Sequence, residues 1–93
     1  MVVGVIVWEL EILGSHSLKD KRRVVRSLKD RLQSRFKVSA AETRHQDLWQ
    51  RAEIAACVVS GEERHAAEVL DAMDRLVLGE MRARVISSQR RYC

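Results

Sequence analysis

Proline is absent from this 93-residue chain, and cysteine and aromatic residues are rare. Because neither proline-rich stretches nor low-complexity segments nor internal repeats occur, nothing marks a linker, and a single domain over residues 1–93 is expected. Two cysteines, Cys57 and Cys93, make neither a disulfide framework nor a metal-binding pair. The sequence therefore favours a reducing cytoplasm and predicts no metal site and no cofactor.

The chain also lacks an apolar segment long enough to cross a bilayer. Its longest apolar run, MVVGVIVWELEIL, is interrupted by Glu9 and Glu11 and has no basic residues in front of it. These features argue against both a signal peptide and a membrane span. The run is instead typical of a buried β-strand, and no contact with a membrane is expected.

Helical and alternating patterns follow this strand. Ser17 and Asp20 form a capping box, and an apolar stripe then continues at helical spacing as far as Phe36. Residues 36–44 and 52–60 alternate between apolar and polar positions, which predicts two strands of an antiparallel hairpin.

The second half of the chain repeats this plan. Ser60 and Glu63 form another capping box, which predicts a second amphipathic helix that stops at Gly79. Residues 80–91 supply a last strand. The order β-α-β-β-α-β indicates an α+β, ferredoxin-like sandwich, in which a four-stranded antiparallel sheet of order 4-1-3-2 carries both helices on one face.

Strand alternation divides the expected sheet into two faces. The face beneath the helices is expected to hold the apolar set Ile6, Trp8, Leu10, Ile12, Phe36, Val38, Ile54, Val58, Met81 and Val85. The opposite face is apolar toward one end and charged toward the other, where Glu9 and Glu11 are expected to pair with Arg82 and Arg84.

An apolar patch on the open face of a chain this small predicts self-association, with a dimer as the expected assembly. The residues assigned to this interface are Val3, Val5, Val7, Val59, Ile86, Leu48 and Trp49. The last two are large apolar residues in a polar connection. They either fold back against the first helix or serve as an exposed anchor.

Positive charge is concentrated in the first helix. Residues 15–37 contain four lysines and five arginines against two aspartates, a local charge of +7, whereas the whole chain carries +4. Such a stripe is typical of contact with phosphate, although an ordinary solvated helix or pairing with acids of another subunit would also account for it. The residues assigned to nucleic-acid or anion contact are Lys19, Lys21, Arg22, Arg23, Arg26 and Lys29.

Scarcity of aromatic residues excludes one mode of RNA binding. An RNA-recognition sheet stacks bases on aromatic side chains of its central strands, and the open-face positions here carry none. Bound RNA is therefore expected to lie along the first helix and the C-terminal RRYC segment, where Tyr92 offers a stacking ring.

A second candidate site is the turn before the first helix. Ser15, His16 and Ser17 could hold a phosphate or sulfate through free backbone amides, although capping alone explains Ser17 and Asp20. No nucleophile lies beside a base in a readable arrangement, and no glycine-rich phosphate loop occurs. The sequence therefore predicts a protein without catalytic activity.

The stretches SLKDKR (residues 17–22) and HQDLWQRA (residues 45–52), with their spacing, resemble the YlxP-like family of small bacterial proteins of unknown function. The likeness covers essentially the whole chain. It implies a ferredoxin-like fold, a tendency to oligomerise and, in some bacteria, a gene neighbourhood shared with translation and ribosome-maturation factors. It implies no catalytic residues.

Together these observations predict a non-enzymatic cytoplasmic homo-oligomer that acts as an RNA- or ribosome-associated accessory factor through its basic first helix. The alternative is a structural or regulatory homo-oligomer that binds an acidic protein partner or a small anion.

Overall fold

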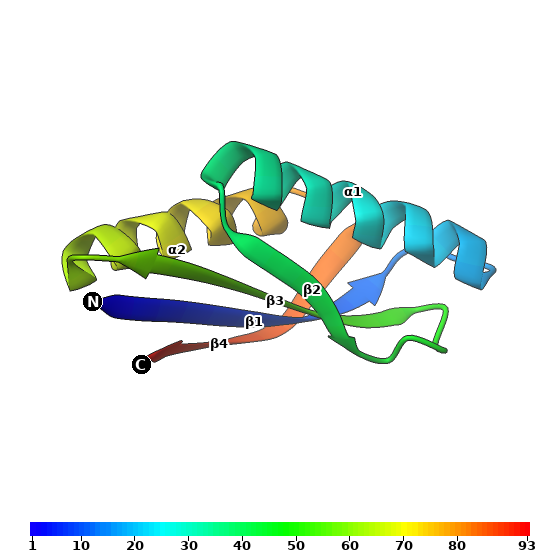
Figure 1. Cartoon of the computed structure of the whole chain (residues 1–93). Coiled ribbons are helices and arrows are strands. Elements are labelled where there is room, and N and C mark those ends of the chain that lie inside the picture. Colours follow the sequence, from blue (N-terminus) through cyan, green and yellow to red (C-terminus); the bar gives the residue numbers. More distant parts are fainter.

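The computed structural model describes all residues from 1 to 93. In chain order the elements are β1 (Val2–Ile12), α1 (Leu18–Phe36), β2 (Ser39–Arg44), β3 (Arg51–Ser60), α2 (Glu63–Leu78) and β4 (Ala83–Tyr92). The strands form one antiparallel sheet of order β2-β3-β1-β4, and both helices lie on the same face of it (Figure 1). The predicted element order and strand order are confirmed. No helix of the protein combines the length and the apolar character needed to span a membrane.

The core lies between the helices and the inner face of the sheet, with β1 at its centre. Trp8 is completely buried, and its indole Nε1–H donates a hydrogen bond to Asp74 of α2 at 2.9 Å. Gly4 lets α2 pack closely on β1, because a Cβ atom there would lie 3.3 Å from Cδ1 of Leu70. The rest of the core alternates along the strands and follows the apolar stripes of the helices, as the sequence pattern predicted, with one exception at Met81.

The two ends of α1 set the position of β2. The hydroxyl of Ser17 accepts a hydrogen bond from the backbone N–H of Asp20 at 3.1 Å, so the predicted start is confirmed. At the other end Lys37 has a left-handed backbone (φ 52°), and its N–H donates to the carbonyl of Gln33. The helix therefore includes Phe36, and β2 begins at Ser39 rather than at residue 36.

Two other predicted boundaries are wrong. The N-cap of α2 is Glu62, and the Ser60 hydroxyl accepts from the Glu62 N–H instead of capping the helix, because Ser60 still belongs to β3. Strand β4 begins only at Ala83, so Met81 and Arg82 lie in the preceding turn, outside the strand alternation. Met81 is 90% exposed and does not belong to the core.

Candidate nucleic-acid interface on the first helix

The outer face of α1 carries a surface groove of about 790 Å³. Every side chain that lines it is polar, and the set is Lys19, Arg22, Arg23, Arg26, Ser27, Asp30 and Arg31. Four of these residues are among the six assigned to phosphate contact from the sequence. The groove therefore brings most of that set together on one surface.

Helical periodicity explains the position of the groove. Lys19, Arg22 and Arg26 recur at intervals of three and four residues, so they share one side of the helix. Leu28 and Leu32 are completely buried on the other side, against the sheet. Burial of the apolar stripe thus turns the cations toward solvent.

The exposed cations of this face have no carboxylate partner. Lys19, Arg22, Arg23 and Arg26 are exposed, and none of them takes part in an ion pair; Lys29 is unpaired as well but partly buried. Asp30 is the single acid of the groove lining. The positive potential of the face is therefore not cancelled by neighbouring side chains.

Most acids of α2, by contrast, are already engaged within the chain. Asp71 and Asp74 both contact Arg90 of β4, at 2.6 and 3.7 Å, and Glu68 contacts Arg64. Pairing of α1 with α2 of another subunit would compete with these bonds. Arg90 of the C-terminal segment is likewise occupied by these two aspartates.

Lys21 does not belong to the exposed face, so its assignment to nucleic-acid contact is wrong. Its side chain is completely buried beneath α1, where the ammonium group lies 2.7 Å from a carboxylate oxygen of Glu42 and donates to the backbone carbonyl of His45. Lys21 therefore ties α1 to β2 and to the start of the hairpin connection. The helical spacing points it toward the sheet, since it lies two residues from Lys19.

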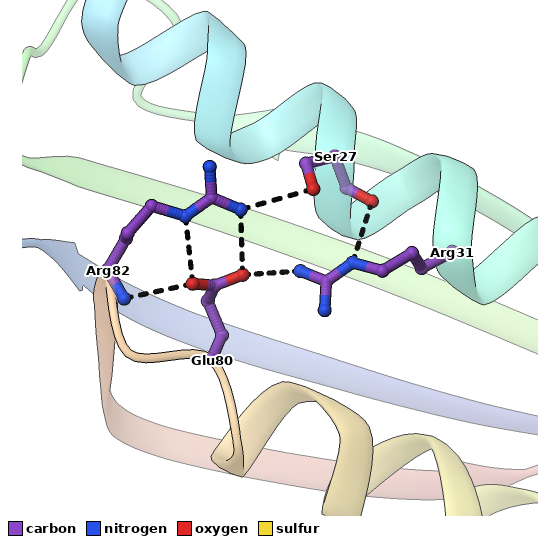
Figure 2. A network of polar contacts seen from close by, with 4 residues as sticks. All are labelled: Ser27, Arg31, Glu80 and Arg82. Atoms are coloured by element: carbon purple, nitrogen blue, oxygen red, sulfur yellow. Dashed lines mark hydrogen bonds and ion pairs between the residues drawn. The ribbon is translucent and has the colours of Figure 1, made fainter.

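A second buried charge fixes the other flank of α1 (Figure 2). Glu80, in the turn between α2 and β4, has a side chain only 6% exposed. Arg82 donates to it from its backbone N–H and from its guanidinium at 2.9 to 3.0 Å, and Arg31 of α1 donates from the other side. Ser27 completes the network, because its hydroxyl accepts from Arg82 and its carbonyl from Arg31.

This network lowers the pKa of Glu80 to about 2, mainly through the hydrogen bonds from Arg82, against the opposing effect of burial. The carboxylate thus stays ionised over the whole neutral range. It holds the Arg31 guanidinium at the border of the basic groove, since Ser27 and Arg31 belong to both.

Sequence reasoning missed the Glu80 network and misassigned Arg82 to the open sheet face. Glu11 does pair with Arg84 as predicted, at 2.9 Å. Glu9 instead binds Arg51 and His45, both at 2.7 Å, and these bonds lower its pKa despite the opposing effect of burial. Arg82 was misassigned because it lies before β4, outside the strand alternation. No local pattern in the sequence shows which residue of the turn will face α1.

Several polar groups of the turn before α1 are already bonded to one another. The Ser17 hydroxyl is bonded to the Asp20 amide, the His16 amide donates to the Asp20 carboxylate at 3.2 Å, and the hydroxyl of Ser15 donates to the Ser17 carbonyl. Ser15 is itself buried. The Asp20 carboxylate thus uses the His16 amide, one of the donors that an anion would need, and the anion-binding turn stays a prediction.

The residues assigned to an oligomer interface fall into two groups. Val3 pairs with Val59 near one end of β1, and Val59 is 64% exposed. Leu48 and Trp49 lie beyond the opposite end, past the pairing of Glu11 with Arg51. Val3 lies eight residues along β1 from Glu11, about 26 Å, and Val5, Val7 and Ile86 lie between these two ends, so the seven residues are spread along the sheet.

Ile86 also departs from the expected patch. The pairing of β4 with β1 shifts between Glu9 and Leu10, which leaves Ile86 as an extra residue between the partners of these two positions. Its side chain is 41% exposed. The valine end of the open face carries a shallow, mainly apolar groove of about 330 Å³ that includes Val5 and Cys57.

Fold and surface together define a small ferredoxin-like α+β protein whose first helix displays unpaired cations. The protein-family model described as "Protein of unknown function (DUF503)" matches residues 3–90, and the chain belongs to this family. It is 37% identical over 59 residues to the uncharacterized protein YlxP of Bacillus subtilis (strain 168), a match that covers 63% of this chain and 64% of that relative.

Two solved structures of designed proteins share the fold. The de novo designed protein LFR1 1 with ferredoxin fold matches with a TM-score of 0.57 at 15% identity, over 100% of this chain and 83% of the other. The de novo designed protein Foldit4 matches with the same TM-score at 8% identity, over 100% and 97% of the two chains. At such low identity these matches show the fold alone.

Proposed function

We propose that the protein is a non-enzymatic RNA-binding accessory factor that holds the phosphate backbone on the outer face of α1. The observation that carries the proposal is the basic groove, whose exposed cations have no partner within the chain. Unpaired, solvated lysines and arginines at regular spacing are what a phosphate backbone requires, because binding releases its condensed counterions. The gene neighbourhood implied by the YlxP-like resemblance favours RNA as the nucleic acid.

Contacts of this kind position a nucleic acid without reading its bases. The affinity for RNA should therefore depend weakly on sequence and fall with salt, with a log-log slope of roughly −2 to −4. Arg22→Gln combined with Arg26→Gln is expected to weaken binding to all RNA sequences and to reduce the slope by about one unit per lost contact.

The matched control removes two arginines from the other helix, as Arg64→Gln with Arg75→Gln. Both residues are exposed on α2, so this variant has the same net charge as the α1 variant. Fluorescence anisotropy with labelled RNA at several salt concentrations measures both effects. Equal losses of RNA affinity in the two variants would show that net charge, and not the groove, determines binding. The absence of binding at low salt would refute the proposal.

Self-association is a second candidate property, and the valine end of the open sheet face supports it. Val59 is 64% exposed, and Val3, Val5 and Val7 of β1 are only partly covered. Face-to-face contact between two copies would remove this apolar surface from water. Light scattering at tens of micromolar, a concentration suited to weak interfaces, should then show a dimer that Val5→Glu or Val59→Glu weakens. A monomeric mass for the unsubstituted protein would refute this candidate.

A further inference from the structure

The connection between β2 and β3 displays a tryptophan that the core does not use. Trp49 is 49% exposed, and the neighbouring Leu48 is 48% exposed. The second tryptophan of the chain, Trp8, is completely buried and hydrogen-bonded to Asp74. Packing in the core therefore does not account for Trp49.

The connection lies against the N-terminal end of α1, where the basic groove begins. The backbone N–H of Ile12 donates to the Gln50 carbonyl at 2.8 Å, and buried Lys21 donates to the carbonyl of His45. A surface concavity of about 440 Å³ is lined both by the turn around His16 and by Gln50. Figure 1 shows the β2–β3 connection and the start of α1 at the same end of the molecule.

Trp49 belongs neither to the apolar valine end of the sheet nor to the C-terminal segment. It lies beyond the pairing of Glu11 with Arg51, and the charged Glu9 and Glu11 separate it from Val7, the nearest of the β1 valines. The second exposed aromatic residue, Tyr92, lies opposite Gly4, near the start of β1 and far from the connection. Trp49 is thus the one exposed tryptophan, tyrosine or phenylalanine at the end of the molecule where Lys19 opens the basic groove.

We propose that Trp49 stacks on an unpaired base of a single-stranded RNA whose phosphates follow the groove from Lys19. This inference rests on the proposed function and specifies its substrate as single-stranded rather than duplex RNA. An aromatic ring close to one end of a row of cations suits proteins that bind single strands without sequence preference, because every base offers a ring face. A paired base inside a duplex would not present that face.

The contrast between the two tryptophans supplies the test. Titration with an oligoadenylate of about twelve nucleotides, within the usual range of binding sites for single strands, is expected to quench the emission of exposed Trp49. Inorganic polyphosphate and a duplex RNA of the same length should leave the emission unchanged. The Trp49→Phe variant should lose the quenching, because only buried Trp8 remains.

Affinity measurements complete the test. Trp49→Ala is expected to lower the affinity for the single strand about tenfold, whereas Trp49→Phe retains a ring and should restore most of it. Neither variant should alter binding of polyphosphate. If Trp49→Ala changes nothing while the Arg22 and Arg26 double variant still weakens binding, the stacking inference is wrong and the proposed function stands.

Further outcomes also decide between the two proposals. Absence of any RNA binding refutes the proposed function together with the inference. Equal affinity for duplex RNA, or a Trp49→Ala variant that changes only the oligomeric mass, refutes the inference alone. Equal affinity for the matching single-stranded DNA would retain the stacked base but refute RNA as the particular ligand.

Discussion

The two flanks of α1 and its outer face contain the same residue types, yet these residues are placed in opposite ways. On the flanks, Lys21 and Arg31 are bonded to carboxylates that are largely buried, those of Glu42 and Glu80. On the outer face, Arg22 and Arg26 extend into solvent with no partner. A helix of uniformly basic appearance is therefore divided into cations that hold the fold and cations that are free to bind.

This division follows from solvation. A charge removed from water must regain its lost solvation from partners within the protein, so each buried cation requires an acid or a carbonyl beside it. An exposed cation has no such requirement, and its surface ion pairs would contribute little in any case. Substitutions on the flanks should therefore change stability, and those on the outer face should change binding.

The largest effect is expected from Lys21→Ala. It leaves the Glu42 carboxylate without its cation and the His45 carbonyl without a donor, and removing one partner of a buried pair costs about 3 kcal/mol or more. Chemical denaturation measures this loss. Lys19→Ala, two residues away on the outer face, should stay within about 0.5 kcal/mol of the unsubstituted protein. Equal losses of stability in the two variants would contradict the distinction between buried cations that stabilise the fold and exposed cations that are free to bind.

A smaller loss in the free energy of unfolding is expected from Glu80→Gln, about 3 kcal/mol at most at neutral pH. This limit follows from the lowered pKa of Glu80 in the folded protein. Since the folded-state pKa lies below that of the unfolded chain, this stabilisation is complete above the unfolded value of 4.5 and is lost as the pH falls toward about 2. Denaturation curves at several pH values should show the variant and the parent converging in acid. A difference independent of pH would show that the charge of Glu80 does not stabilise the fold.

The smallest effect is expected from Asp30→Asn, which removes the single acid of the basic groove. At low salt the affinity for RNA should rise about twofold, since an exposed charge several ångströms from phosphate contributes roughly 0.5 kcal/mol in water. The gain should disappear at high salt, while the free energy of unfolding stays unchanged. Anisotropy titrations at two salt concentrations measure the change. A loss of affinity would show that Asp30 positions the arginines rather than opposing the ligand.

Much of the fold could be predicted from local pattern. The alternation around Trp8 and the capping box at Ser17 each depend on nearby residues, and the structure confirms both. The start of β2 at Ser39 and the position of Met81 could not be predicted in this way. The left-handed turn at Lys37 ends the helix after Phe36, and the turn after α2 places Met81 outside the strand.

Of the candidate site, the sequence predicted the concentration of positive charge but not the partners of the individual residues. The excess of lysine and arginine in residues 15–37 is plain in the sequence, and helical spacing places Lys21 on the buried stripe of Val25 and Leu28 rather than with Arg22. Local spacing did not show which acid Lys21 meets, because Glu42 lies more than twenty residues away. Similarly, nothing near Glu80 in the sequence indicates that it meets Arg31.

The sequence by itself determined the order of the elements, the identity of the central apolar strand and the presence of a basic helix, because burial and helix capping act over a few residues. Only the tertiary structure decided which cations are paired, that the connection carrying Trp49 lies at the end of α1 that carries Lys19, and that exposed Val59 lies at the other end of the sheet. These relations join residues distant in the chain. They follow from how the helices and hairpin are placed on the sheet, and each buried charge finds its partner only after that placement.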